Sequence, residues 1–78
     1  MKPINQKNTK NFTLYYIAHV DNLEGIHTNH FCSVDFEHLS EAVKEVENLA
    51  ELSDGELDFE CLFIVDNKEP KEILIRYN

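Results

Sequence analysis

Hydrophobic and polar residues alternate along residues 10–20, which is the pattern of a strand that buries one face. One face would carry Phe12, Leu14, Tyr16, Ala18 and Val20, and the other Thr13, Tyr15, Ile17 and His19. Residues 21–25 have the composition of a turn, in which Gly25 can adopt a positive φ. A second alternating segment lies within 26–36, so the two segments predict a β-hairpin.

The middle of the chain has the spacing of one helical face, with apolar residues recurring at i, i+3, i+4 and i+7. These residues are Leu39, Ala42, Val43, Val46, Leu49 and Ala50. We expect Ser40 to cap the N-terminus of the helix, with a start one or two residues earlier as the alternative, and Glu41 to complement the helix dipole. Ser53, Asp54 and Gly55 would end the helix, with Gly55 in the left-handed conformation.

The chain after the helix predicts a second hairpin. Residues 59–65 are almost continuously apolar, which favours a central strand. Residues 66–70 form a turn, in which Pro70 excludes an interior ladder position, and residues 71–77 alternate again. We expect the two hairpins to meet through their first and last strands.

The predicted fold class is therefore α+β: a ββαββ domain whose four-stranded antiparallel sheet packs one helix on one face. Residues 1–8 would be a flexible N-terminal tail, and residues 9–78 a single domain. The face without the helix would carry Tyr15, Ile17 and either Leu62 or Ile64. Such an apolar surface is typical of a contact site, although scattered surface aromatic residues would explain it equally well.

Charge narrows the function further. Fifteen acidic residues against seven basic ones give a net charge of −8, which disfavours direct binding to nucleic acid or to an anionic membrane. A basic protein surface is the partner that this charge favours. We find no apolar run of membrane-spanning length and no apolar signal segment at the N-terminus, so we expect a cytoplasmic location.

Most of the negative charge falls between residues 35 and 60, where ten acidic residues accompany a single base, Lys44. On a helical wheel the acids of the helix avoid the apolar stripe and spread over the solvent side. Carboxylates about 5–6 Å apart on a rigid helix can imitate a row of phosphates, whereas the alternative is that they only keep the domain soluble. The candidate partner-binding residues are Glu41, Glu45, Glu47, Glu51, Asp54 and Glu56.

Other chemistries are disfavoured. His27, His30, Cys32 and His38 are zinc ligands by type, but alternation along the strand turns His27 away from His30 and Cys32. Cys32 and Cys61 are expected on inward faces, where thiols are inert. With Gly25 and Gly55 as its only glycines, the chain has no glycine-rich phosphate loop. We therefore expect no cofactor, no metal site and no enzymatic activity.

Two resemblances bear on function. The segment 35–42, DFEHLSEA, resembles the strand-to-helix joint of HicB-type antitoxin domains, which also pack a hairpin against a helix. Those domains carry a strand rich in Gly-Tyr and Pro-Gly-Cys before the joint, and residues 27–33 of this chain lack that pattern. In size, acidity and element order the whole chain is similar to small phage-encoded inhibitors, including some anti-CRISPR proteins. That likeness has no motif, so it assigns no residue. It implies a non-enzymatic inhibitor of a nucleic-acid-binding partner. A self-associating domain that contacts a second copy through the open sheet face is the alternative.

Overall fold

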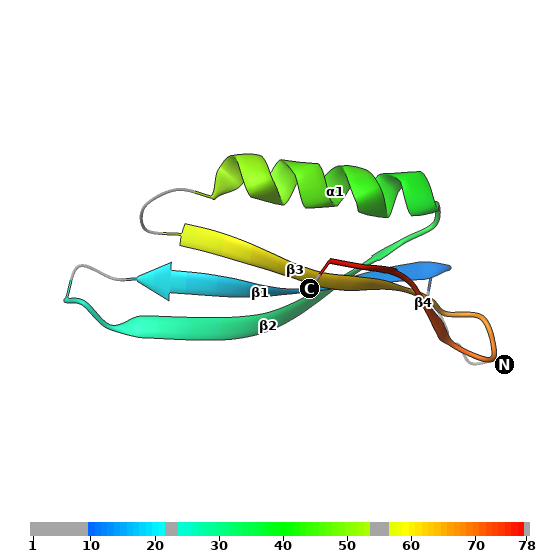
Figure 1. Cartoon of the computed structure of the whole chain (residues 1–78), viewed down its shortest axis with the longest axis horizontal. Coiled ribbons are helices and arrows are strands. Elements are labelled where there is room, and N and C mark those ends of the chain that lie inside the picture. The colour runs from blue at the N-terminus through cyan, green and yellow to red at the C-terminus, as the bar shows by residue number, and fades with distance from the viewer. Residues whose placement is uncertain (1–9, 22–23, 54–56, 78) are drawn as a thin grey trace, which may run out of the picture.

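A computed structural model describes residues 10–21, 24–53 and 57–77 of the chain. Its elements are β1 (Phe12–Asp21), β2 (His27–Phe36), α1 (Leu39–Leu52), β3 (Leu57–Asp66) and β4 (Glu72–Arg76). The four strands form one antiparallel sheet in the order β2-β1-β3-β4, and α1 contacts this sheet (Figure 1). The predicted ββαββ fold is confirmed. The predictions for the tail, for Asp54, for Gly55 and for Glu56 fall outside the described residues.

The first hairpin is formed by β1 and β2, which pair from Phe12 opposite Phe36 to Asp21 opposite His27. Gly25 in the connection has a φ of 80°, in the left-handed region that favours glycine. Both the hairpin and the role of Gly25 were predicted from the sequence.

The joint between the two hairpins differs from the prediction. The first and last strands do not pair; instead β1 pairs with β3, so the third strand joins the hairpins. The apolar β3 is central, as expected, because it has a neighbour on each side. The short β4, which begins two residues after Pro70, is left at the edge, where fewer ladder hydrogen bonds are needed.

A β-bulge interrupts the pairing of β1 with β3. Tyr15 lies opposite Phe63 and Tyr16 lies opposite Cys61, so Leu62 is an additional residue in β3. An extra residue reverses the alternation of faces beyond it. Phe63 therefore shares a face with Tyr15, although plain alternation would place it with Cys61.

The bulge also decides where Ile64 points. Ile64 is fully buried in the core beneath the helix, so the expectation that it could lie on the open face is wrong. A second irregularity between β3 and β4 places Ile75 opposite Ile64 and Ile73 opposite Val65. Ile75 consequently packs against the core, whereas Ile73 is exposed.

The core lies between α1 and one face of the sheet and is small. Its buried cluster consists of Leu14, Ala42, Leu49 and Ile64, of which Leu14 and Ile64 are the large fully buried side chains among the described residues. Partly buried residues surround this cluster: Phe12, Tyr16, Phe36, Leu39, Val43, Val46, Phe59, Cys61 and Ile75. Ala50, assigned by its spacing to the same stripe, is exposed.

The ends of α1 are fixed by hydrogen bonds of Glu41 at its N-terminus and of Ser53, the predicted helix end, at its C-terminus. The N-cap is His38, two residues before Ser40, so Ser40 is not the cap and the alternative of an earlier start is confirmed. Glu41, expected to complement the dipole, also accepts a hydrogen bond from the backbone N–H of His38 at 3.1 Å. At the other end the Ser53 hydroxyl donates to the Leu49 carbonyl at 3.1 Å and accepts the Phe59 N–H at 3.0 Å, which ties the helix to β3.

The turn after β3 is fastened to the start of β1 by Asn67. Its side-chain amide donates to the Lys10 carbonyl at 2.9 Å and to the Thr13 hydroxyl at 2.8 Å. The buried Thr13 in turn donates to Asp35 at 2.7 Å.

Within the described residues, α1 is the one helix, and it lacks the length and apolar character that spanning a bilayer requires.

Candidate protein-binding surfaces

The outer surface of α1 carries three of the predicted acids in exposed positions, Glu41, Glu47 and Glu51. Glu45 is half-buried. It follows Ala42 by three residues and precedes Leu49 by four, so it lies at the margin of the buried stripe. The expectation that all four helix acids face solvent therefore holds for three of them.

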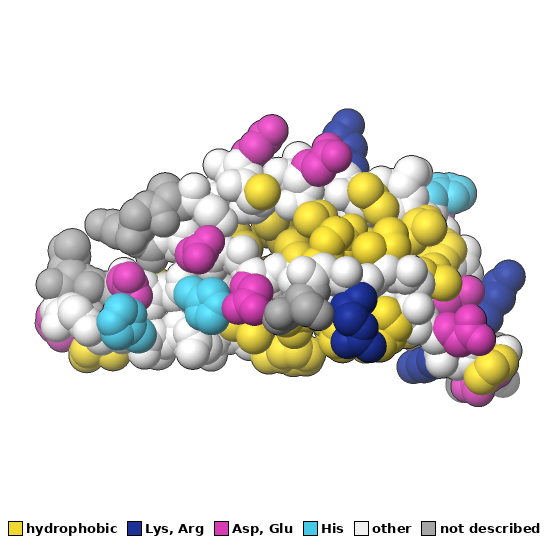
Figure 2. Space-filling model, in the orientation of Figure 1, with side chains coloured by type: hydrophobic (Ala, Val, Ile, Leu, Met, Phe, Trp, Pro, Cys, Tyr) yellow, Lys and Arg dark blue, Asp and Glu magenta, His cyan; other side chains and the backbone are white. Residues whose placement is uncertain are grey.

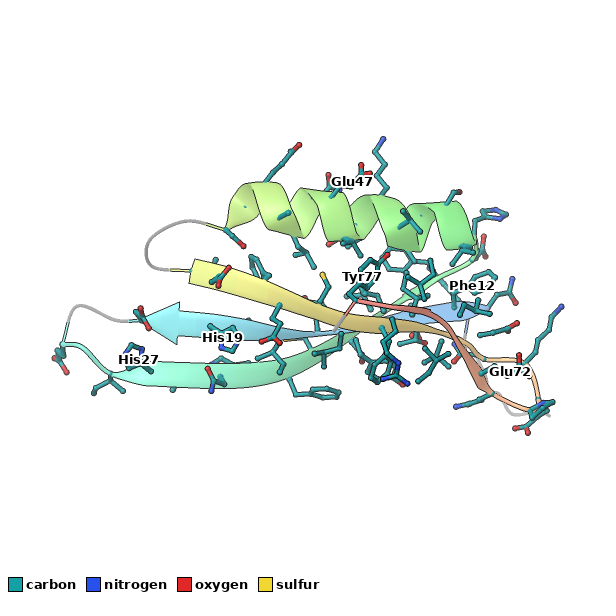
Figure 3. All side chains as sticks on the ribbon, in the orientation of Figure 1. Phe12, His19, His27, Glu47, Glu72 and Tyr77 are labelled. Atoms are coloured by element: carbon teal, nitrogen blue, oxygen red, sulfur yellow. The ribbon has the colours of Figure 1, made fainter. Side chains whose placement is uncertain are left out.

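The acids lie on different sides of the helix. Burial raises the pKa values of Tyr16 and Cys61 above their ordinary values, and the Glu45 carboxylate raises both further. Burial likewise raises the pKa of Tyr77, with a smaller contribution from Glu47. Glu45 therefore lies over β1 and β3, whereas Glu47 lies toward Tyr77, which follows β4 (Figure 3). Residues two apart are about 200° apart around a helix, so the carboxylates form a curved surface and not one flat plate.

In the part of the chain that the structure describes, no Lys or Arg forms an ion pair with a carboxylate of α1. Among the described residues, the two ion pairs join His19 to Glu60 at 3.0 Å and His27 to Asp21, and neither involves Lys or Arg. Glu45 accepts one hydrogen bond from the neutral Asn48 amide at 3.4 Å. Acidic side chains project from the outer surface of the helix in Figure 2, next to a basic side chain. We define Glu41, Glu45, Glu47 and Glu51 as the acidic helix surface.

The sheet face opposite α1 carries an aromatic cluster. The Tyr15 ring lies 5.7 Å from the Phe31 ring and 5.3 Å from the Phe63 ring, between centroids. Ile17 lies opposite Phe31, and Phe31 is 66% exposed. In Figure 2, hydrophobic side chains also gather on the side of the sheet that faces away from the helix.

The aromatic cluster was only partly visible in the sequence. Tyr15 and Ile17 were predicted for this face, and the alternation of β2 could have added Phe31. Phe63 could not have been found, because only the bulge at Leu62 brings it to Tyr15.

Beside the aromatic cluster, a polar row crosses three strands. His19 Nδ1 lies 2.7 Å from Asn29 Oδ1 on β2, and His19 Nε2 lies 3.0 Å from Glu60 Oε1 on β3. The hydrogen bond to Glu60 and then that to Asn29 raise the pKa of His19 above its ordinary value of 6.5. His19 and His27 both lie on the part of the first hairpin that extends toward its turn (Figure 3).

The candidate metal ligands do not come together. Alternation places His27 on the open face and both His30 and Cys32 on the helix face, as predicted. Within residues 10–21, 24–53 and 57–77, no three His, Cys, Asp or Glu side chains are grouped closely enough to hold a metal ion.

The two thiols are also separated. Cys32 and Cys61 both lie opposite Tyr16, on either side of β1. Two strand spacings amount to about 9–10 Å, which exceeds the Cα separation of about 7 Å that a disulfide tolerates. Both thiols are half-buried, and burial raises the pKa of Cys61, which lowers its thiolate fraction at neutral pH.

Comparisons with protein-family models, curated proteins and solved structures found no match for this chain.

Proposed function

We propose that this chain is a non-enzymatic binding domain that inhibits a nucleic-acid-binding protein, by laying its acidic helix surface on the basic site where that protein holds nucleic acid. The observation that carries the proposal is the pair Glu47 and Glu51, exposed on a packed helix with no Lys or Arg paired to either among the described residues. Small phage-encoded inhibitors, to which the chain is similar in size, acidity and element order, imply the same kind of role. We expect the partner to be cytoplasmic, as we expect of this chain.

The helix supports this role because it fixes the spacing of its carboxylates. Glu47 and Glu51 are four residues apart, so their Cβ atoms are about 5–6 Å apart on one side of the helix. Like charges at this spacing cost a few tenths of a kcal/mol when the protein is free. A basic partner would remove that repulsion and add long-range attraction to the encounter.

The individual acids contribute differently. Glu41 already accepts the His38 N–H, and Glu45 is half-buried, so both are partly committed to the fold. Glu47 and Glu51 are therefore the principal contacts. The predicted contacts Asp54 and Glu56 follow in sequence, outside the described residues.

The shape favours binding over catalysis. The smallest principal extent is 18 Å, which corresponds to one sheet and one helix in contact. A layer of this thickness leaves little depth for a substrate cleft, which typically encloses about 300–1,000 Å³.

The experiment compares two double variants of equal charge. Glu47→Lys with Glu51→Lys changes the acidic helix surface, and Glu69→Lys with Glu72→Lys changes exposed acids around the start of β4. Each pair reduces the net negative charge from −8 to −4, because each Glu→Lys substitution adds two positive units to the sequence total. Both variants and the parent serve as baits in a lysate of the source cells, and the captured partner is then purified and titrated.

We expect the first variant to lose the partner and the second to keep it within a few-fold of the parent affinity. The partner's own binding to labelled nucleic acid should be blocked by the parent and not by the first variant. Equal binding of all three baits would contradict the proposal, as would a partner that binds nucleic acid and the parent at the same time.

A further inference from the structure

The two edges of the sheet are protected very differently. The β4 edge is five residues long, has Glu72 and Arg76 at its ends and follows Pro70, all of which discourage pairing with another strand. The β2 edge is ten residues long, from His27 to Phe36, and contains no Lys, Arg, Pro or Gly. Its first five residues are all exposed. A long and unprotected edge of this kind is a template for another strand.

We propose that a second copy of this chain pairs with the β2 edge, antiparallel and about a two-fold axis, so that the two sheets become one sheet of eight strands. Isologous pairing of this kind uses the same strand in both copies. This interface is separate from the acidic helix surface, and the proposal does not depend on the inhibitory function.

Geometry restricts the register. Residues directly opposite each other lie on the same face of a sheet. Each residue must therefore pair with one whose number has the same parity, and the axis must pass midway between one residue and its own copy. With Phe31 on the axis, His27 lies opposite Asp35 of the second copy on the open face, while within each copy His27 stays paired with Asp21 and Asp35 accepts the Thr13 hydroxyl. In the same register His30 lies opposite Cys32, and Asn29 lies opposite Ser33.

The Phe31 register also covers the most exposed aromatic ring. Phe31 is 66% exposed and stacks on Tyr15. Pairing about Phe31 places two such stacks side by side on the open face, so that the aromatic cluster of each copy shields that of the other. Cross-strand aromatic pairs are among those that stabilise sheets.

The β2 edge carries little charge, so a second copy of this acidic chain can approach it. Each chain carries −8, so two copies repel each other over most of their surfaces. Among the ten residues of β2, Asp35 is the single acid, whereas the acids of the helix lie on the opposite side of the sheet from the aromatic cluster. Two acidic molecules can therefore approach through the β2 edge with little local repulsion. Added salt should strengthen the dimer, because it screens the remaining long-range repulsion.

The first test measures mass by sedimentation equilibrium for the full chain and for two variants. Phe31→Lys places like charges opposite each other on the axis, whereas Leu52→Lys makes the same change at a side chain that is 59% exposed on α1. We expect the parent and Leu52→Lys to dimerise, and Phe31→Lys to do so at least about tenfold more weakly, a loss of about 1.4 kcal/mol. A parent that stays monomeric up to about 1 mM, where an association of about 4 kcal/mol is visible, would overturn the proposal, as would equal dimerisation of both variants.

The second test determines the register without removing Phe31. In His30→Cys the new thiol lies opposite the native Cys32 of the second copy, with Cβ atoms about 4.5–5.5 Å apart. Mild oxidation should then yield a covalent dimer on a non-reducing gel, and the same substitution combined with Cys32→Ser should not. A covalent dimer that forms equally well without Cys32, or none from His30→Cys, overturns this register.

The two proposals fail separately. Self-association through β2 should grow stronger with salt and should not be weakened by Glu47→Lys with Glu51→Lys, since the lower net negative charge reduces the long-range repulsion between two copies. Binding of a basic partner should grow weaker with salt and be strongly affected by the same substitutions. A dimer that weakens with salt and is weakened by the helix substitutions contradicts the β2 interface and leaves the inhibitory function to its own test.

Discussion

Replacing Ile64 with alanine removes one of the two large side chains that the structure buries fully. Three carbons are lost, which corresponds to about 2.4 kcal/mol at about 0.8 kcal/mol for each buried methylene. The cavity that remains between Leu14 and Leu49 raises the cost to about 3–4 kcal/mol, within the range of about 2–5 kcal/mol for such substitutions. A domain of 78 residues has a total stability of about 4–12 kcal/mol, so this single change removes a large share of it.

Phe63→Ala is the informative comparison, because Phe63 is adjacent in sequence and larger. Its ring is half-buried on the open face, where its recognised partner is Tyr15 at 5.3 Å between centroids. Loss of that aromatic contact costs about 0.5–1.5 kcal/mol beyond the area uncovered, and we expect about 1–2 kcal/mol in total. The smaller side chain should therefore be the more costly one to remove.

The free energies of unfolding can be measured by urea denaturation, followed by far-ultraviolet circular dichroism, with the slope of each transition compared with the parent. Strict alternation through Cys61, without the bulge at Leu62, would turn Phe63 inward and Ile64 outward. A larger loss of stability for Phe63→Ala than for Ile64→Ala would refute the bulge and the packing derived from it.

Three further predictions concern single groups. An NMR titration should give His19 a pKa above 6.5, because Glu60 and Asn29 favour its protonated form, and Glu60→Gln should lower that pKa. Since the pKa is raised on folding, the stabilisation is present below pH 6.5 and is lost as the pH rises through the raised value; a pKa at or below 6.5 contradicts the arrangement. In a Cys32→Ser background, Cys61 should react with a thiol reagent more slowly than free cysteine at the same pH, because burial raises its pKa, and reaction at the free rate would show that the thiol is not shielded. Glu41→Ala should destabilise the fold by about 0.5–1 kcal/mol and Ser40→Ala by less, whereas the reverse order in thermal unfolding would restore Ser40 as the cap.

The sequence predicted each element because each has a recognisable pattern of apolar residues. The alternation of residues 10–20 and the helical spacing from Leu39 to Leu49 specify one buried face apiece, and two such faces must cover each other. A continuous apolar run, and not a period, identified β3 as central, because such a run suits a strand with neighbours on both sides.

The joint between the hairpins and the bulge were beyond reach for a physical reason. Alternation reports which face a side chain occupies, but it carries no information on which strand lies alongside. An added residue such as Leu62 reverses the faces without leaving a distinctive residue type, so Ile64 and Phe63 exchanged their expected sides.

The acidic helix surface was predicted from the same helical wheel, and its exposed members follow that wheel. Glu45 departs from it because the most deeply buried helix residues, Ala42 and Leu49, are displaced toward its side of the apolar stripe. A helical wheel assumes that burial is symmetrical about the middle of the apolar stripe, whereas in the structure burial is deepest on the side of Ala42 and Leu49.

The central claim is that Glu47 and Glu51 occupy a nucleic-acid site on a basic partner. Its most direct test is a competition titration, in which the purified partner holds a labelled oligonucleotide and the parent protein is added at several salt concentrations. We predict full displacement of the oligonucleotide at low salt and an inhibitor affinity that declines steadily as salt rises. Persistent fluorescence anisotropy of the oligonucleotide while the parent is bound, or an inhibitor affinity indifferent to salt, would contradict the claim.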